Sequence, residues 1–205
     1  MNLRLISLRG SDMLPYLDDL AQLRIAVFRD WPYLYAGDMQ YERKYLKTFA
    51  ESEHAFLVLA LAEVSGVERV AGASTALPLI QETENIQAPF LAHNIAISDV
   101  YYFSESVLLK NYRGQGLGVG FFEAREQEAR RLGFSMAAFC GVVRPDHHPL
   151  RPANHVPLDA FWRKRGFSRR EGMVCYIPWK DLGEAEESPK PLHFWTKDLV
   201  TPDDP

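Results

Sequence analysis

The fold is decided by residues 108–120, which read Leu-Leu-Lys-Asn-Tyr-Arg-Gly-Gln-Gly-Leu-Gly-Val-Gly. The apolar segment from Ser106 to Leu109 reads as the end of a strand, and a helical pattern begins directly after the glycines. A strand end, a glycine turn and a helix N-terminus together favour an anion, because unpaired N–H groups and the helix dipole point at it and glycine allows close approach. The stretch therefore predicts a site for a phosphate-bearing cofactor.

Three known phosphate loops compete for this sequence. A nucleotide-triphosphate loop needs a lysine after its glycines, and none follows here. A dinucleotide loop, Gly-x-Gly-x-x-Gly counted from Gly114, would place its third glycine at Val119. The third pattern, Arg-Gly-x-Gly-x-Gly before an amphipathic helix, fits residue for residue from Arg113 to Gly118. The alternative that remains open is a glycine-rich helix cap without any ligand.

Composition bounds the class of protein. The 205 residues are 47% apolar and 24% charged, with a net charge of −4, which is typical of one folded domain and gives no nucleic-acid footprint. The longest apolar run, Ala55 to Ala62, is too short to cross a bilayer, and the N-terminus lacks a signal-like apolar core. We therefore expect a cytoplasmic protein with no nucleic-acid or membrane partner. Cys140 and Cys175 lie in apolar runs and are interpreted as free core thiols.

The hydrophobic periodicity predicts an α/β (α+β) chain with strands and helices interleaved. Strands are expected at residues 3–8, 56–63, 69–77, 99–109, 135–143, near 167 and at 173–179. Helices are expected at 12–29, 39–50, 117–132 and 158–165. Residues 78–98 fit no regular element and are interpreted as a long functional loop, and residues 144–157 as a second loop rich in proline and histidine.

The chain resembles the GNAT family of acyl-CoA-dependent N-acetyltransferases. The family's pyrophosphate loop, Gln/Arg-x-x-Gly-x-Gly/Ala, matches Arg113 to Gly118, and residues 159–167, Asp-Ala-Phe-Trp-Arg-Lys-Arg-Gly-Phe, resemble its second signature. The resemblance implies the GNAT fold: a mixed sheet of about seven strands, splayed between strands 4 and 5 and flanked by about four helices. It covers a single domain at residues 1–180, followed by an acidic, proline-containing tail at 181–205.

The resemblance also implies acetyl-CoA as the cofactor, with its pantetheine arm lying between the splayed strands. The cofactor-binding residues carried over are Val107, Leu108, Leu109, Arg113, Gly114, Gln115, Gly116, Leu117, Gly118, Asn154 and Trp162. An N–H group near Val107 or Leu108 is expected to hold the thioester oxygen. Trp162 stands where family members often carry a tyrosine that protonates the leaving thiolate, so another tyrosine, or unassisted departure, is required.

Glu105 is the expected catalytic base, because it sits among apolar strand residues at a position that is often acidic in the family. The alternative is a strand glutamate that pairs with an arginine or faces solvent. Cys140 suggests a covalent acetyl-cysteine route, but a core thiol is the simpler interpretation. His147, His148 and His155 match no standard metal-ligand spacing, so no metal is expected.

The acceptor side is expected around the link between the first two helices. Trp31, Tyr33, Tyr35 and Tyr101 are the candidate substrate-binding residues, and the alternative for the first three is that they only hold the two helices together.

The predicted function is therefore transfer of an acetyl group from acetyl-CoA to a primary amine of a small or amino-acid-like molecule, by direct attack in a ternary complex. The competing hypothesis is a non-catalytic acyl-CoA-binding sensor of the same fold. Family members often dimerise, so a homodimer is also an expectation. The sequence identifies neither the acceptor nor the length of the acyl group.

Overall fold

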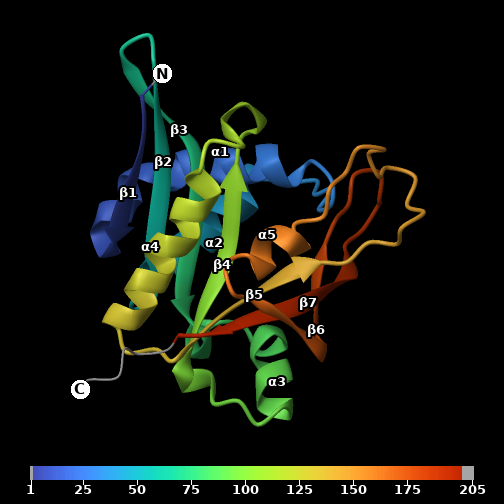
Figure 1. The fold of residues 1–205 in the computed structure, drawn as a ribbon. Coiled ribbons are helices and arrows are strands. Elements are labelled where there is room, and N and C mark those ends of the chain that lie inside the picture. The colour runs from blue at the N-terminus through green and yellow to red at the C-terminus, as the bar shows by residue number, and fades with distance from the viewer. Residues whose placement is uncertain (1, 200–205) are drawn as a thin grey trace.

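The computed structural model describes residues 2–199. Seven strands form one sheet in the order β1-β2-β3-β4-β5-β7-β6 (Figure 1). Their bounds are β1 (Leu3–Arg9), β2 (Phe56–Val64), β3 (Val67–Pro78), β4 (Val100–Leu108), β5 (Met136–Val142), β6 (Ser168–Trp179) and β7 (Ser188–Asp198). The α-helices are α1 (Leu17–Phe28), α2 (Met39–Glu51), α3 (Glu84–Ala92), α4 (Leu117–Arg131) and α5 (Asp159–Arg163). Short 3₁₀ turns are η1 (Gly10–Tyr16), η2 (Leu79–Gln81), η3 (Ile97–Asp99) and η4 (Lys110–Tyr112).

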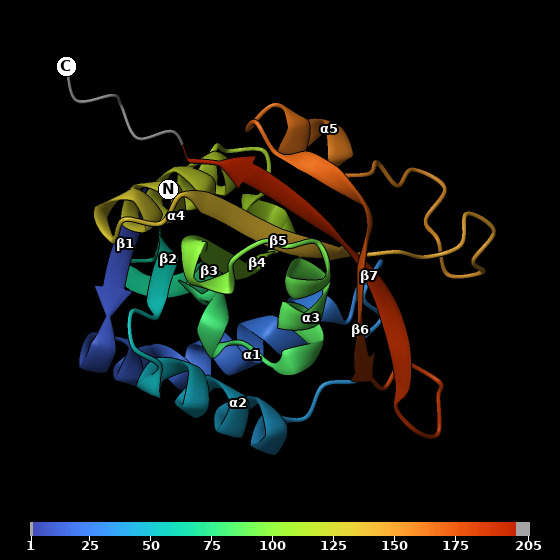
Figure 2. The same ribbon diagram turned by 90° about the horizontal axis from the view of Figure 1, so that it is seen from below.

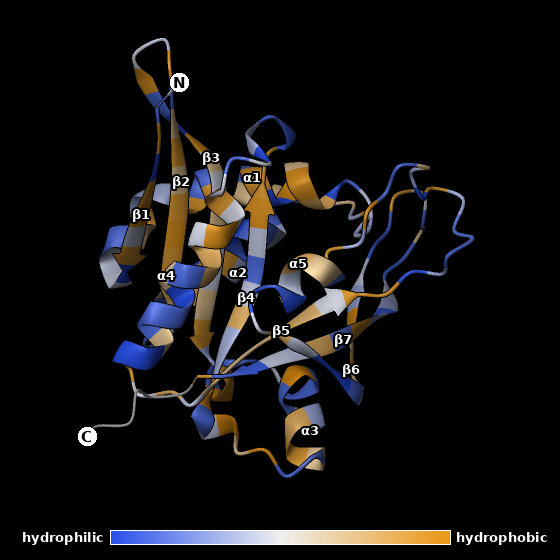
Figure 3. Ribbon diagram, viewed as in Figure 1, coloured by the Kyte–Doolittle hydropathy of each residue, from blue (hydrophilic) through white to orange (hydrophobic). Residues whose placement is uncertain are grey.

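The sheet is covered on both faces. Helix α4 lies against one face of β1–β4, and α1 and α2 lie against the other, as the two perpendicular views show (Figures 1 and 2). This sandwich explains why the first seven residues of β2, Phe-Leu-Val-Leu-Ala-Leu-Ala, are apolar and buried without alternation, which Figure 3 shows as an orange strand. Two hydrophobic cores result, one on each face of the sheet.

Strands β4 and β5 separate after a short parallel pairing. Only Val100–Tyr102 of β4 pair with Met136–Ala138 of β5, while both strands continue beyond that point. The two arrows diverge in Figure 1. The expected seven-stranded sheet with a splay between strands 4 and 5 is therefore confirmed, and we call the point of separation the fork.

A bulge in β4 decides which side chains face which core. The pairing with β3 advances two residues, from Thr75 to Leu77, while β4 advances three, from Glu105 to Tyr102. Tyr101 and Phe103 consequently lie in the core beneath α4, whereas Tyr102 and Val107 lie in the core beneath α1. The extra residue switches the side-chain alternation, which places residue 105 on the same face as residue 102.

Two expectations about local structure were wrong. Residues 78–98 are not a structureless loop, since they contain η2, α3 and η3. Pro89 suggests a break, yet it lies inside α3, because Phe90 is fully buried and packs edge-to-face against Phe194 of β7, with ring centroids 4.9 Å apart. The first helix begins as the 3₁₀ turn η1, which contains Pro15, before α1 continues it.

The segment from residue 181 is not a tail outside the domain. Residues 188–198 form β7, which pairs with both β5 and β6, and the expected strands near 167 and at 173–179 are the two ends of one irregular strand, β6. Pro189 and Pro191 make the sequence of β7 unlike that of a strand. Both precede Leu192, where the pairing of β7 with β5 begins, so neither position needs an N–H group to donate to β5. Residues 200–205 lie outside the described part.

None of the helices in residues 2–199 combines the length and the apolar content that a bilayer span needs.

Candidate active site

The glycine turn, residues 113–118, joins the end of β4 to α4. Gly114 has φ of +76° and Gly116 has φ of +83°, a backbone conformation in which other L-residues are strained. Gly116 is the N-cap of α4, and a Cβ atom added at either glycine would meet nothing within 4 Å. The turn is therefore an open backbone surface directly before a helix.

The amides of the turn, more than its side chains, are available to a ligand. The N–H groups of Leu117 and Gly118 begin α4 and have no preceding helical carbonyl to bond, as at every helix start. Arg113 instead donates from Nε to the carbonyl oxygen of Leu108 at 3.0 Å, and Gln115 donates to the carbonyl of Asn111 at 3.3 Å. The expected anion cradle therefore rests on main-chain groups and the dipole of α4.

The end of β4 offers a free backbone edge. The N–H of Leu109 bonds to Ala71, and Val107 pairs with Ala73 of β3, so both present their backbone groups to β3. Because backbone groups alternate along a strand, Leu108 presents its own to the open side of the fork. Val107 has a fully buried side chain and backbone groups that face β3, so Leu108 is the better candidate for a cofactor contact.

A cavity of about 270 Å³ opens beside the fork. Residues of both separating strands line it, Tyr102, Ser104 and Glu105 from β4 and Cys140 from β5. The other walls come from α1, α2, the link between them, the segment after β3, and β6 and β7. They comprise Arg24, Phe28, Tyr33, Tyr35, Tyr41, Tyr45, Glu82, Thr83, Asn85, Ile86, Ile177, Pro178, Trp179, Glu187 and Leu192. We call it the fork cavity.

Solved structures with the same arrangement decide the fold. A proposed acetyltransferase from Acinetobacter baylyi superposes with a TM-score of 0.63 at 14% identity, over 100% of this chain and 97% of that one. The chain has the GNAT fold. No protein-family model matches the sequence, and no curated protein does.

Two further structures share the GNAT fold. A proposed acetyltransferase from Salmonella typhimurium, solved with its cofactor acetyl-CoA, has a TM-score of 0.57 at 13% identity, over 100% of this chain and 98% of that one. A ribosomal-protein-alanine N-acetyltransferase from Brucella melitensis has a TM-score of 0.55 at 16% identity, over 94% and 99% of the two chains. At such identities the likeness establishes the GNAT fold, and activity must be argued from the site.

The predicted acceptor residues divide between the cavity and other places. Tyr33 and Tyr35 line the fork cavity. Trp31 packs instead against His148 and His155, with ring centroids 5.1 Å and 5.8 Å away. Tyr101 lies on the opposite face of the sheet, fully buried.

Tyr102, which the sequence analysis does not single out, lines the fork cavity in place of Tyr101. The hydroxyl of Tyr101 donates to the carbonyl of His54 at 2.8 Å, and Tyr101 lies in the other core and does not line the cavity, so the structure does not support it as a substrate contact. Tyr102 faces the cavity, because successive strand residues point to opposite faces. The hydroxyl of Tyr102 lies 3.0 Å from Sγ of Cys140 across the fork.

Glu105 is paired with an arginine. Arg24 of α1 forms ion pairs with both Glu105 and Glu42, and the side chains of all three are nearly or fully buried. Arg24 also lies over the ring of Tyr45 at 4.6 Å. Of the two interpretations of Glu105, the structure therefore supports the buried ion pair, and the carboxylate is already engaged by a cation.

Arg125 of α4 supports the bulge that brings Glu105 to the cavity. It is buried and donates to the carbonyls of Phe121, Thr75 and Glu105 at 3.1, 3.4 and 3.3 Å. Ser74 donates to the same Glu105 carbonyl at 2.9 Å. These bonds satisfy backbone groups that a bulge leaves without ladder partners.

Glu82, at the end of η2, is a cavity carboxylate that sequence reasoning missed. Burial raises the pKa of Glu82, and hydrogen bonds from the Thr83 backbone and Ser104 offset only part of that change. The sequence offers one signal for Glu82, an acidic residue within an apolar, irregular segment. No local pattern shows that the fold brings residue 82 next to β4.

Cys140 is poorly suited to covalent catalysis. Its contact with the Cys175 thiol and its burial raise the pKa of Cys140 well above the ordinary value, so the nucleophilic thiolate is disfavoured. Burial likewise raises the pKa of Tyr102, so its hydroxyl keeps its proton near neutrality. Both cysteines are free thiols.

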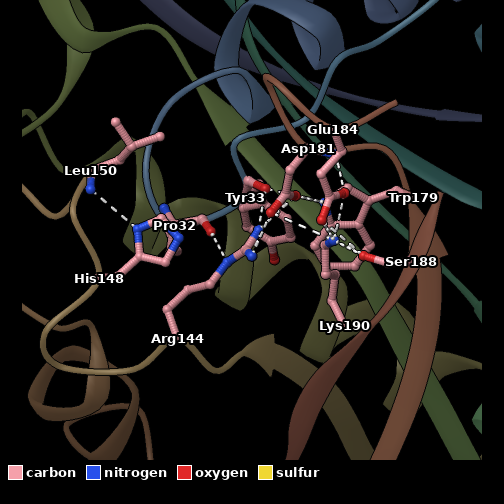
Figure 4. A network of polar contacts seen from close by, with 10 residues as sticks. All are labelled: Pro32, Tyr33, Arg144, His148, Leu150, Trp179, Asp181, Glu184, Ser188 and Lys190. Atoms are coloured by element: carbon pink, nitrogen blue, oxygen red, sulfur yellow. Dashed lines mark hydrogen bonds and ion pairs between the residues drawn. The ribbon is translucent and has the colours of Figure 1, made fainter. Parts of the chain in front are cut away.

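A buried network fixes one wall of the cavity (Figure 4). Arg144, which follows β5, donates to both carboxylate oxygens of Asp181 at 2.6 and 2.8 Å and to the carbonyls of Pro32 and Tyr33 at 2.8 and 2.6 Å. The indole nitrogen of Trp179 donates to the same Asp181 at 2.8 Å. The network holds the link between α1 and α2 against β6, and thereby positions Tyr33 and Trp179.

The second signature lies on the α4 side of the sheet. Trp162 of α5 packs on Gly141, where an added Cβ would lie 3.0 Å from its ring, and its ring centroid is 5.0 Å from that of Phe139. Asn154 is exposed in the loop before α5. Neither lines the fork cavity, so their contact with a cofactor remains a prediction.

Metal ligands are not assembled in the described part of the chain. Within residues 2–199, no three His, Cys, Asp or Glu side chains lie together in a way that could hold an ion.

Proposed function

We propose that this protein is an N-acetyltransferase that moves the acetyl group of acetyl-CoA to a primary amine of a small molecule. The observation that carries the proposal is the fork cavity, which is lined by both separating strands, together with the open glycine turn that follows β4 in the chain. A diphosphate on the turn and a reacting group at the fork require a long cofactor with phosphate at one end. Coenzyme A has that form.

In this proposal the turn binds the diphosphate through main-chain N–H groups from Gly114 to Gly118. The pantetheine arm follows the open edge of β4 beyond Tyr102, where strand backbone groups lack a partner strand. The N–H of Leu108, on this open edge, binds the pantetheine arm, and the thioester lies further along the edge, toward Tyr102. The groups that bind the cofactor are thus mostly main-chain groups, which remain in place when side chains change.

The reaction forms one bond and breaks one. The amine nitrogen, as the free base, attacks the thioester carbonyl carbon, and the carbon–sulfur bond then breaks with its electron pair going to sulfur. The nitrogen loses two protons in all when it starts as an ammonium ion, one to a base and one that ends on the thiolate. Tyr102 is assigned to deliver the proton to sulfur, because it keeps its proton near neutrality and borders the fork.

Glu105 is assigned a supporting role. It holds Arg24 in place against Glu42, so that the floor of the cavity keeps its shape. Its carboxylate contributes to the negative potential of the cavity but is not free to take a proton while the ion pair stands.

Thiol release from acetyl-CoA in the presence of a panel of small amines tests the proposal. We expect release with at least one primary amine, and calorimetric binding of coenzyme A in its absence. Binding of coenzyme A with no release on any amine would support the non-catalytic sensor instead, and no binding would overturn both.

A further inference from the structure

Glu82 is a carboxyl group of the fork cavity that has no cationic partner within residues 2–199. The charged groups of its wall are one cation, Arg24, and three carboxylates, Glu82, Glu105 and Glu187. Arg24 is already shared by Glu105 and by the buried Glu42. Among the described residues, two long hydrogen bonds reach the carboxyl group of Glu82, from the backbone N–H of Thr83 at 3.3 Å and from the hydroxyl of Ser104 at 3.4 Å.

The backbone of Glu82 is held rigidly at the cavity wall. Its N–H bonds to the carbonyl of Leu79 at 3.0 Å, and its own carbonyl accepts from Gln87 at 2.6 Å. Ser104, its side-chain partner, lies at the bulge of β4, directly after the fork. The carboxylate is therefore presented at a fixed place, next to where the proposed thioester is delivered.

The rest of the wall is rich in aromatic rings. Phe28, Tyr33, Tyr35, Tyr41, Tyr45, Tyr102 and Trp179 surround the cavity. Rings favour apolar bodies, and their faces also attract cations. The volume of about 270 Å³ lies just below the usual range of ligand pockets, about 300–1,000 Å³, so the occupant is small.

We propose that the fork cavity takes a small primary amine carried on an apolar ring body, and that Glu82 binds the ammonium group and takes its proton. This inference rests on the proposed acetyl transfer and narrows its acceptor. An amine that also carries a carboxylate, such as a free amino acid, is disfavoured, because the cavity has no unpaired cation to receive the second charge.

The proton balance is simple. One proton passes from the ammonium nitrogen to Glu82, the free amine attacks the thioester carbon, and the second nitrogen proton ends on the departing sulfur through Tyr102. Glu82 then returns its proton to solvent when the products leave.

Glu82 is the group expected to gain or lose a proton near neutrality, because the titratable groups that face it keep theirs. The titratable groups that face it are Tyr45 of α2, Tyr102 of β4 and Cys140 of β5, with Arg24, Glu105 and Glu187 elsewhere in the wall. The pKa of Tyr45 is raised to about 12 by burial, and those of Tyr102 and Cys140 are raised as well, so these three keep their protons near neutrality. Activity should therefore rise with pH as Glu82 loses its proton.

The experiment compares two acceptors and three proteins. Thiol release at saturating acetyl-CoA is measured with phenethylamine and with phenylalanine, which adds a carboxylate to the same ring and amine. Full-length wild type is compared with Glu82→Gln and with Glu84→Gln, an exposed glutamate of α3 outside the cavity wall. Melting temperature and coenzyme A affinity are measured for all three.

For the wild type we expect kcat/KM to be at least about tenfold higher for phenethylamine than for phenylalanine. Glu82→Gln should lower kcat/KM for phenethylamine about a hundredfold and remove the acid limb of the pH profile, as for loss of a general base. Its melting temperature and coenzyme A affinity should stay close to those of the wild type. Glu84→Gln should match the wild type in every measurement.

The inference is overturned if folded Glu82→Gln keeps wild-type kcat/KM and pH profile, or if phenylalanine is the better acceptor. Either result, with turnover intact, leaves the proposed acetyl transfer standing. If coenzyme A binds but neither amine is acetylated, calorimetry of phenethylamine with the coenzyme A complex decides. Phenethylamine binding that is present in the wild type and lost in Glu82→Gln would support the amine site. No phenethylamine binding to the wild type would overturn the inference.

Discussion

The glycine turn and the fork cavity are built in opposite ways. The turn is six consecutive residues that act through their backbone, and a Cβ added at Gly114 or Gly116 meets no protein atom. The cavity is assembled by side chains from α1, α2, the segment after β3 and four strands. A backbone site is encoded locally, whereas a side-chain site depends on the whole fold. The two should therefore fail differently when they are mutated.

The largest effect is expected where the cavity depends on buried charge. Arg24→Met leaves Glu42 and Glu105 buried without a cation, which should lower the free energy of unfolding by about 3–5 kcal/mol. Urea denaturation measures it. Arg43→Met, which breaks an exposed pair with Asp18, is the matched control and should cost less than about 1 kcal/mol. Equal small losses in the two variants would contradict a cavity held by buried pairing.

A substitution in the glycine turn should weaken coenzyme A binding and should lower stability less than Arg24→Met does. Gly116→Ala places a methyl group on its open surface and should weaken coenzyme A binding about a hundredfold, about 2.7 kcal/mol, as measured by calorimetry. Gly10→Ala is matched for backbone strain, because Gly10 also has positive φ and open space around it. Both variants should lose about 1–2 kcal/mol of stability, and only the first should lose affinity. Wild-type affinity in both would remove the turn from the binding site.

The helix behind the turn is anchored by an acid-sensitive pair. Burial alone would raise the pKa of Glu128, but hydrogen bonds from Arg9 and Arg131 lower it to about 2. This carboxylate therefore stabilises the fold above its unfolded pKa of about 4.5, and the contribution is lost as pH falls toward 2. Its size should be about 2 kcal/mol, since both arginines are half exposed and screened.

Denaturation of Glu128→Gln across this pH range measures the effect. The variant should be less stable than the wild type near neutrality and should approach it near pH 2. Glu68→Gln, which removes an exposed pair with Arg4, should change the acid dependence in the same direction but by much less, because solvent screens that pair. A wild-type acid dependence in Glu128→Gln would show that α4 is anchored by other contacts.

The smallest effect separates two adjacent tyrosines on opposite faces of β4. Tyr102→Phe removes the proposed proton donor and should lower kcat about tenfold, about 1.4 kcal/mol, because a thiolate is a tolerable leaving group. Tyr101→Phe removes only the hydrogen bond to His54, and should cost about 1 kcal/mol of stability with kcat unchanged. The same kcat in both variants would withdraw Tyr102 from the chemistry.

The same contrast explains what the sequence could predict. The turn, the sheet of seven strands and the splay follow from local patterns and from the resemblance that residues 113–118 and 159–167 carry. The predicted strand count agrees partly for the wrong reason, because the sequence pattern divides β6 into two strands and gives β7 the composition of a tail. Two prolines argue against a strand at residues 188–198, and β7 is recognised as a strand only from its pairing with β5 and β6.

The cavity was beyond local patterns. The bulge in β4 changes which residues share a face, so the sequence points to Tyr101 although Tyr102 lines the cavity wall. The partner of Glu105 is 81 positions away in the sequence, at Arg24, and the contact of Glu82 with Ser104 spans 22 positions. Such pairings arise from tertiary packing, which periodicity does not encode.

The most direct measurement of the central claim is a crystal structure of the complex with coenzyme A. We predict diphosphate oxygens about 3 Å from main-chain nitrogens between Gly114 and Gly118, with the sulfur at the fork facing Tyr102. A diphosphate bound elsewhere on the chain, or a sulfur outside the fork cavity, would contradict the account.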